Sequence, residues 1–385
     1  MAINELIMLF SKKFASEPLL IEAPGRINLI GEHTDYNDGW VLPAAIDKSV
    51  KLAVQKSGSS HCTIIAYDIN DEYSFSLEQE ISPVQQQWVN YFLGVVSELQ
   101  KRNAPLVGFN LIFTSNIPIG AGMSSSAAIE CGIGYALDQL LQLNISPLDL
   151  ALMAQQAEHK FIEVKCGIMD QFTSIMGKKG HVVQLDCRSL KYAYYPADFK
   201  EYQLVLFDSG IKHNLANSAY NARRKECEQA FHIARKVNAN ATSLRDISLD
   251  QLLKVKVAMD PVVYNRAKYI IEENERVLEV CNLLRTQDIE NVGRLMFETH
   301  NGLMNLYNVS CKEIDLLVEL ARESPAIIGA RMMGGGFGGC TINIIKSSDV
   351  EDVVASIEKA YKSQIHKELK VYHVALADGV HRVVI

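Results

Sequence analysis

A glycine- and serine-rich turn between two apolar segments constrains this chain more than any other stretch. The β-prone run 109–114 precedes the turn, and residues 129–143 follow it with the spacing of a helix. Gly120 and Gly122 can take positive φ and let a ligand approach the backbone. The serines at 124–126 fall where the helix begins, so we expect them to cap it and to offer hydroxyl donors beside its positive end. The turn predicts either a phosphate site or an ordinary capped helix, and three successive serines favour the phosphate.

The better-known phosphate-binding motifs do not account for this turn. The chain contains no Walker loop, and it has neither the His-Arg-Asp nor the Asp-Phe-Gly sequence of protein kinases. A Gly-x-Gly-x-x-Gly sequence occurs at Gly334, Gly336 and Gly339, but the β-like run 340–345 follows it where a dinucleotide site requires a helix. The remaining pattern, at 118–127, resembles the second motif of the GHMP small-molecule kinases.

The bulk composition narrows the class of protein. The chain has 385 residues, enough for two domains, and its 48% hydrophobic and 22% charged residues are typical of a soluble globular protein. A net charge of −7 argues against a nucleic-acid partner, and no apolar run approaches the roughly 20 residues of a membrane helix. We expect no secretory signal, because the start of the chain lacks a basic region followed by an apolar one. The 8 cysteines and 10 histidines are scattered, which argues against a zinc site, and we expect a cytoplasmic monomer.

A loop near the N-terminus, residues 24–39, carries a high density of functional groups. It contains Arg, Asn, Glu, His, two Asp and Tyr, and the apolar Ile27, Leu29 and Ile30 alternate with them. A polar surface loop with a turn at 37–39 would be the plainer interpretation. The alternation indicates partial burial instead, and buried charged groups need partners. A sugar supplies such partners, because carboxylates accept from vicinal hydroxyls while His, Asn and Arg donate to them.

Residues 25–36 resemble the galactokinase signature position for position. This signature separates galactokinases from mevalonate and homoserine kinases. The segments 88–91, 157–159 and 166–172 are also similar to that family, and 329–339 resembles the third GHMP motif. The resemblance covers nearly the whole chain. It implies an α+β fold with the two-domain GHMP architecture, domains at 1–200 and 201–385, and an active site in the cleft between them.

The reaction that the resemblance implies is transfer of the γ-phosphoryl group of ATP to the anomeric hydroxyl of D-galactose, with Mg²⁺ as cofactor. The alternatives are a kinase for N-acetylgalactosamine, arabinose or galacturonate, and a sensor that binds galactose and ATP without turnover. The first would need only one substitution in the pocket. The second is disfavoured because the serine segment is intact.

The resemblance also implies residue roles. Asp170 would accept the proton or orient the hydroxyl, and Arg26 would stabilise charge on the transferring group. Mg²⁺ would bind Ser126 and Glu158. The sugar would contact Arg26, Glu32, His33, Thr34, Asp35, Gly167, Asp170 and Tyr220. The nucleotide would contact Gly120, Ala121, Gly122, Met123, Ser124, Ser125, Ser126 and Trp88.

The residues alone leave plainer interpretations open. Glu158 could form a salt bridge at a helix edge, Asp170 could be a helix N-cap, and Trp88 could be a core residue.

Periodicity predicts the remaining elements. The predicted helices are 3–15, 83–102, 220–237, most of 249–321, and 349–364. The predicted strands are 19–23, 50–55, 63–67, 73–77, a pair formed by 181–185 and 203–208, 341–345 and 370–375, with a turn at 208–213.

Overall fold

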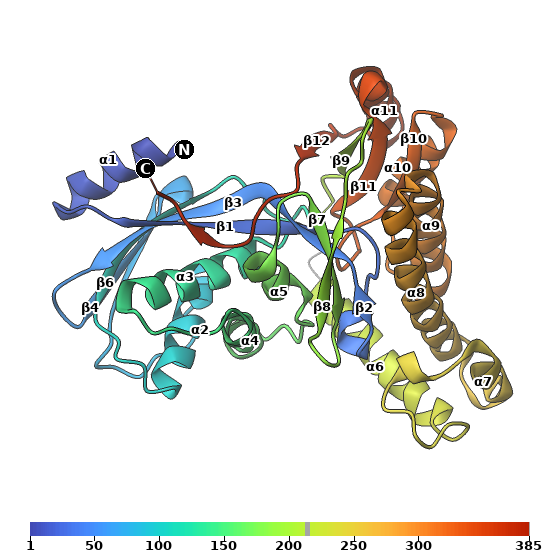
Figure 1. Cartoon of the computed structure of the whole chain (residues 1–385), viewed down its shortest axis with the longest axis horizontal. Helices are drawn as coiled ribbons and strands as arrows, with labels where there is room; N and C mark the ends of the chain where they lie inside the picture. The colour runs from blue at the N-terminus through green and yellow to red at the C-terminus, as the bar shows by residue number, and fades with distance from the viewer. Residues whose placement is uncertain (212–215, 385) are drawn as a thin grey trace.

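The computed structural model describes residues 1–211 and 216–384, so the predicted turn at 208–213 lies partly outside the described residues. The described residues form the α+β fold that the sequence predicts, with three sheets and their covering helices (Figure 1). Within the described ranges, no helix has both the length and the apolar character that crossing a membrane requires.

The largest sheet is built mainly from the first third of the chain. Its six strands lie in the order β13 (His381–Arg382), β1 (Leu19–Asn28), β3 (Pro43–Lys56), β6 (Phe109–Ser115), β4 (His61–Ala66) and β5 (Asp71–Ser76). One face is covered by α2 (Gln87–Lys101), α3 (Ser125–Leu141), α4 (Pro147–Ala157) and α5 (Met169–Met176), and α1 (Ile3–Phe14) packs on the other (Figure 1). Gly132 lets α3 approach closely, since a Cβ there would lie 2.8 Å from Leu52.

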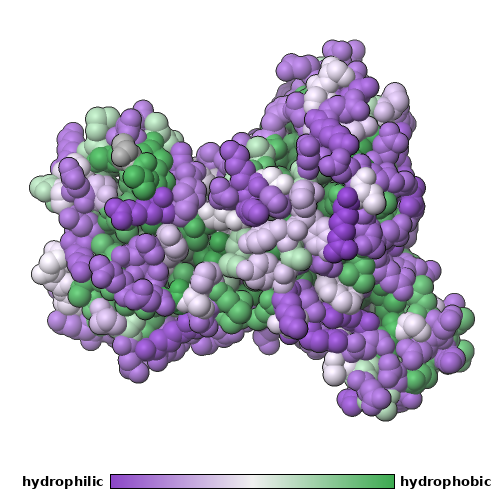
Figure 2. All heavy atoms as spheres, in the orientation of Figure 1, coloured by the Kyte–Doolittle hydropathy of each residue, from purple (hydrophilic) through white to green (hydrophobic). Residues whose placement is uncertain are grey.

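The second half of the chain forms another sheet and a group of long helices. The four strands lie in the order β10 (Ile327–Met332), β11 (Cys340–Lys346), β9 (Tyr202–Asp208) and β12 (Lys370–Val374). The helices of this half are α6 (Ala216–Ala234), α7 (Leu249–Lys254), α8 (Pro261–Thr286), α9 (Ile289–Gly302), α10 (Lys312–Glu323) and α11 (Val350–Ile365). Helices α9 and α10 pack against β10. Hydrophilic side chains cover much of the face seen in Figure 2, which is notched between the two ends of the molecule.

The predicted pairing of 181–185 with 203–208 is wrong. Strand β7 (His181–Asp186) pairs with β2 (Trp40–Val41) and β8 (Tyr192–Pro196), whereas β9 pairs with β11 and β12. The intervening β8 escaped notice because only Tyr195 on it is buried, so the strand lacks an alternating apolar face. The predicted glycine loop at 329–339 is also shorter than expected, because β10 continues to Met332.

The division into domains 1–200 and 201–385 stays a prediction. Strand β9 begins just after that boundary, while β13 returns from the C-terminal end to pair with β1.

Candidate active site

A single cavity of about 490 Å³ brings together most of the predicted site residues. Five segments meet at this cavity. They are the N-terminal loop (24–39), the glycine- and serine-rich turn at 118–127 (the serine turn), the segment between α4 and α5, the start of α6, and the glycine loop (329–339). The predicted residues that line it are Arg26, Glu32, His33, Asp35, Gly120, Gly122, Met123, Ser124, Ser125, Ser126, Glu158, Gly167, Asp170 and Tyr220.

Three predicted site residues do not line this cavity. The Thr34 hydroxyl lies within hydrogen-bond distance of the Gly31 and Trp40 carbonyl oxygens and braces the loop. Ala121 is buried under the turn. The indole of Trp88 donates to Asp71 at 2.8 Å and packs in an aromatic cluster. Their contacts with a ligand stay predictions.

Two of the residues that line the cavity, Arg26 and Asp170, form an ion pair. The guanidinium Nε and Nη2 each lie 2.7 Å from one carboxylate oxygen of Asp170, which is the bidentate geometry that Arg favours. Burial opposes the charge of Arg26, but the negative charges of Asp170 and Glu32 outweigh it and raise the pKa of Arg26. The third nitrogen, Nη1, donates to the Gly122 carbonyl of the serine turn.

The backbone around Arg26 explains this placement. The register of β1 on β3 shifts between Pro24 and Arg26, and such a bulge redirects the side chain that follows it. Gly25 must be glycine here, because a Cβ would lie 2.6 Å from the Met123 carbonyl oxygen. The Arg26 amide donates to that same oxygen at 3.1 Å. Strand β1 and the serine turn are therefore in direct contact.

The serine turn has the predicted glycine geometry but a different cap. Gly120 and Gly122 have φ values of 80° and 74°. Ser124 occupies the N-cap position, yet its backbone is left-handed and its hydroxyl donates to Asp170 instead of to the helix. The expectation of a side-chain cap was wrong: a capping hydroxyl must accept from a helix N–H, whereas the left-handed Ser124 places its hydroxyl against the Asp170 carboxylate. Because the Ser124 side chain does not accept from them, the first backbone N–H groups of α3 have no cap and can bind an anion.

Glu158 provides a buried carboxylate on the far side of the turn. It begins a short π-helical segment, Glu158–Ile162, that continues α4, and Gln171 donates to it at 2.5 Å. Burial, together with the charge of Asp170, raises the pKa of Glu158 to about 7. The described residues contain no group of three or more His, Cys, Asp or Glu placed to hold a metal ion. Ser126 and Glu158 both line the cavity and offer oxygen ligands, so their chemistry fits a hard cation such as one that also binds phosphates and water.

The part of the cavity that the sequence assigns to a sugar (the sugar side) is formed by Glu32, His33 and Asp35. His33 Nδ1 pairs with the Tyr36 hydroxyl at 2.7 Å, while its buried Nε2 has no partner among the described residues. Burial and the charge of Arg223 lower the pKa of His33 to about 3, so the ring is neutral. Asp35 faces Gly167, where a Cβ would lie 1.9 Å from its carboxylate oxygen. Only glycine fits beside this carboxylate.

Several lining residues were missed by sequence reasoning. Tyr91 lines the cavity, whereas Trp88, on the same helix and in the same family-like segment, does not. Gly334, Gly335 and Gly336 also line it, and their membership of a glycine-rich motif was the available signal. Val164 contributes apolar surface that no motif indicates, and Ile119 does so from a variable position of the pattern at 118–127.

Comparisons with known proteins show the family to which the chain belongs. Three family models match the chain: the galactokinase galactose-binding signature at 8–56, the GHMP kinases N terminal domain at 90–178, and the GHMP kinases C terminal at 282–363. Galactokinases of Chloroflexus aggregans and Thermosipho africanus are each 40% identical over 94% of this chain, and the matches cover 93% and 99% of those proteins. The chain belongs to the galactokinase family of GHMP kinases. The cavity draws residues from all three matched regions.

Solved structures extend the galactokinase match to three dimensions. The structure of Lactococcus lactis galactokinase complexed with galactose has a TM-score of 0.95 at 28% identity, and the alignment covers 100% of both chains. Methanococcus jannaschii mevalonate kinase has a TM-score of 0.69 at 19% identity over 94% of this chain and 99% of its own, which shows a shared fold. The predicted GHMP fold is confirmed.

The half-buried carboxyl of Asp35 predicts a specific pH dependence of stability. Burial, and next the charge of Asp170, raise its pKa from 3.8 to about 7. The folded state therefore binds the proton more tightly than the unfolded state, and stability falls as pH rises between these values. We expect Asp35→Asn to remove this loss, so that the variant gains about 1–3 kcal/mol over the wild type between pH 5 and pH 8.

Urea unfolding at several pH values measures the difference. Glu158 titrates in both the wild type and Asp35→Asn, so its contribution cancels from the difference in stability between them. The control is Asp198→Asn, which removes an exposed carboxylate. A stability difference that stays constant with pH would contradict the prediction.

Proposed function

We propose that this chain transfers the γ-phosphoryl group of ATP to the anomeric hydroxyl of D-galactose, giving α-D-galactose 1-phosphate and ADP. The observation that carries the proposal is one cavity that is lined both by Glu32, His33 and Asp35 and by the serine turn. Arg26 and Asp170 line the same cavity and bond to the serine turn at Gly122 and Ser124. Membership of the galactokinase family supports the same reaction.

Positioning and charge neutralisation account for the chemistry. Phosphoryl transfer through a loose transition state needs alignment of the acceptor more than a strong base. Arg26 and the Ser124 hydroxyl both bond to Asp170, so its carboxylate has a fixed place from which to orient the sugar hydroxyl or accept its proton. The guanidinium also offers positive charge to the transferring group.

The nucleotide phosphates would bind the uncapped start of α3 and the backbone of the serine turn at Gly120 and Gly122. Ser126 and Glu158 would hold Mg²⁺, which supplies charge neutralisation on the phosphates when bound. The oxygen chemistry of these two residues fits such a hard cation.

The sugar would bind through hydroxyl contacts to Glu32, His33 and Asp35, with Tyr220 and the Gly167 backbone completing the pocket. These groups are largely desolvated, so a sugar of the wrong configuration leaves some of them unpaired. The pocket can therefore discriminate between epimers. We further propose that the protein acts as a cytoplasmic monomer on these small molecules.

The proposed reaction is tested by incubating the protein with ATP, Mg²⁺ and a panel of sugars, and detecting the sugar phosphate by ³¹P NMR. We expect D-galactose to give the highest kcat/KM and a 1-phosphate product. A higher kcat/KM with arabinose, N-acetylgalactosamine or galacturonate would assign a different substrate. Galactose and ATP binding without any turnover would indicate a sensor.

The role of Asp170 predicts a separation of turnover from binding. Asp170→Ala should lower kcat by about 10²–10⁴-fold, because the acceptor hydroxyl loses its orienting or proton-accepting group. Galactose binding, measured by calorimetry, should remain detectable because Glu32, His33 and Asp35 are unchanged. Asp198→Ala, at an exposed position, serves as the control. Near-normal turnover in Asp170→Ala would show that another residue has this role.

A further inference from the structure

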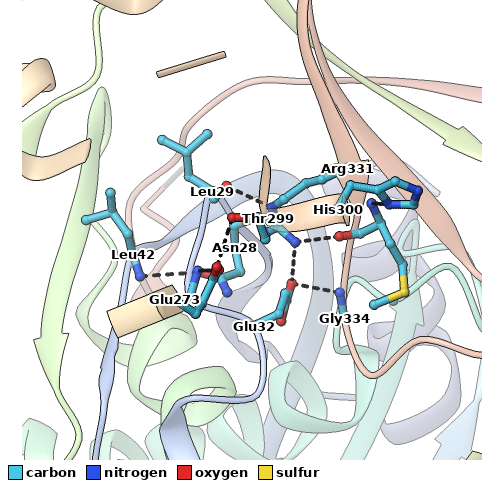
Figure 3. A network of polar contacts seen from close by, with 12 residues as sticks. Asn28, Leu29, Glu32, Leu42, Glu273, Thr299, His300, Arg331 and Gly334 are labelled. Atoms are coloured by element: carbon cyan, nitrogen blue, oxygen red, sulfur yellow. Dashed lines mark hydrogen bonds and ion pairs between the residues drawn. The ribbon is translucent and has the colours of Figure 1, made fainter. Parts of the chain in front are cut away.

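Arg331 is a completely buried cation that has no part in the mechanism above. It lies on β10, its side chain is 0% exposed, and all three of its guanidinium nitrogens are engaged (Figure 3). Nε donates to the Leu29 carbonyl at 2.9 Å, and Nη2 donates to that of Asn28. Nη1 lies 3.1 Å from Glu32 Oε1 and also donates to the Met332 carbonyl. This side chain thus joins β10 to the N-terminal loop, about 300 residues earlier in the chain.

The Glu32 carboxylate is held at one oxygen. Oε1 accepts from Arg331 and from the backbone N–H of Gly334, the latter at 2.8 Å (Figure 3). Among the described residues, no hydrogen bond reaches Oε2. Glu32 lines the cavity, so this second oxygen is left to accept from a ligand.

We propose that Arg331 is a positioning residue for the sugar, which acts by fixing the orientation of the Glu32 carboxylate. The proposal rests on the function proposed above. The planar guanidinium bonds to a carboxylate and three backbone carbonyls at once, which an ammonium group with three donors cannot do. Without it, Glu32 would keep only the Gly334 amide and would carry a buried, poorly paired charge.

The backbone of the loop has supports that do not involve Arg331. The Tyr269 hydroxyl donates to the Glu32 carbonyl at 3.0 Å, and Glu273 accepts from the Gly31 amide at 2.8 Å. Thr299 and Arg276 both donate to Glu273 in turn (Thr299 and Glu273 are shown in Figure 3). A change at Arg331 should therefore alter the Glu32 side chain more than the path of the loop.

Galactose affinity measured by calorimetry, without nucleotide, tests the proposal. We expect Arg331→Met to raise the Kd for galactose by about tenfold or more, and Arg331→Lys to raise it less. The Kd for a Mg²⁺-bound, non-hydrolysable ATP analogue should change by less than about threefold, because the serine turn keeps its own contacts with Arg26.

The matched control is Arg266→Met. Arg266 is also buried, pairs with Glu226 at 2.7 Å and does not line the cavity. The Arg266→Met variant should lower the thermal midpoint of unfolding about as much as Arg331→Met does, but should leave the Kd for galactose unchanged. An equal loss of galactose affinity in Arg266→Met would show that Arg331 acts only through general stability, and would overturn the proposal.

A double-mutant cycle shows whether Arg331 acts through Glu32. The effects of Arg331→Lys and Glu32→Gln on the Kd for galactose should be clearly non-additive. Additive effects, or a Kd for Arg331→Met within about twofold of the wild type, would overturn the proposal. The cycle uses the lysine variant, so it decides the question even where Arg331→Met does not fold. Failure of the wild type to bind galactose would overturn the proposed function instead.

Discussion

The ion pair between Arg26 and Asp170 is the contact on which the rest of the cavity depends. It joins β1 to α5, and the same guanidinium reaches the Gly122 carbonyl of the serine turn. The Ser124 hydroxyl, from the same turn, donates to the Asp170 carboxylate. Burial opposes the charge of Arg26, so the pair is stable only because the two groups meet in bidentate geometry beside further polar contacts. Three segments that are far apart in the sequence are held together at the point where phosphoryl transfer would occur.

A second set of contacts holds the sugar side of the cavity from the other half of the chain. Helix α8 and strand β10 contact the N-terminal loop through Tyr269, Glu273 and Arg331. These side chains supply hydrogen-bond partners for backbone groups of Leu29, Gly31 and Glu32. A polar pocket held in this way can be ordered before the sugar arrives, and less ordering then opposes binding.

Local patterns predicted most helices, whereas the fold class and the site residues were predicted from the resemblance to galactokinases. Periodicity gave α3, and glycine chemistry gave the positive φ of Gly120 and Gly122. The pairing of β7 with β8 was not predictable, because register depends on contacts outside the strand. The orientation of Ser124 depends on Asp170, 46 residues away. Arg331 lies in the motif at 329–339, but its contacts with Glu32 could not be predicted, since these two residues are about 300 positions apart in the sequence.

The most direct measurement is a crystal structure of this protein with galactose and a non-hydrolysable ATP analogue bound together. We expect both ligands in the cavity described above, with the anomeric oxygen beside Asp170 and within roughly 3–4 Å of the terminal phosphorus. The phosphates should lie at the start of α3, and the sugar should contact Glu32. Ligands found in separate pockets, too far apart for direct transfer, would contradict the shared site.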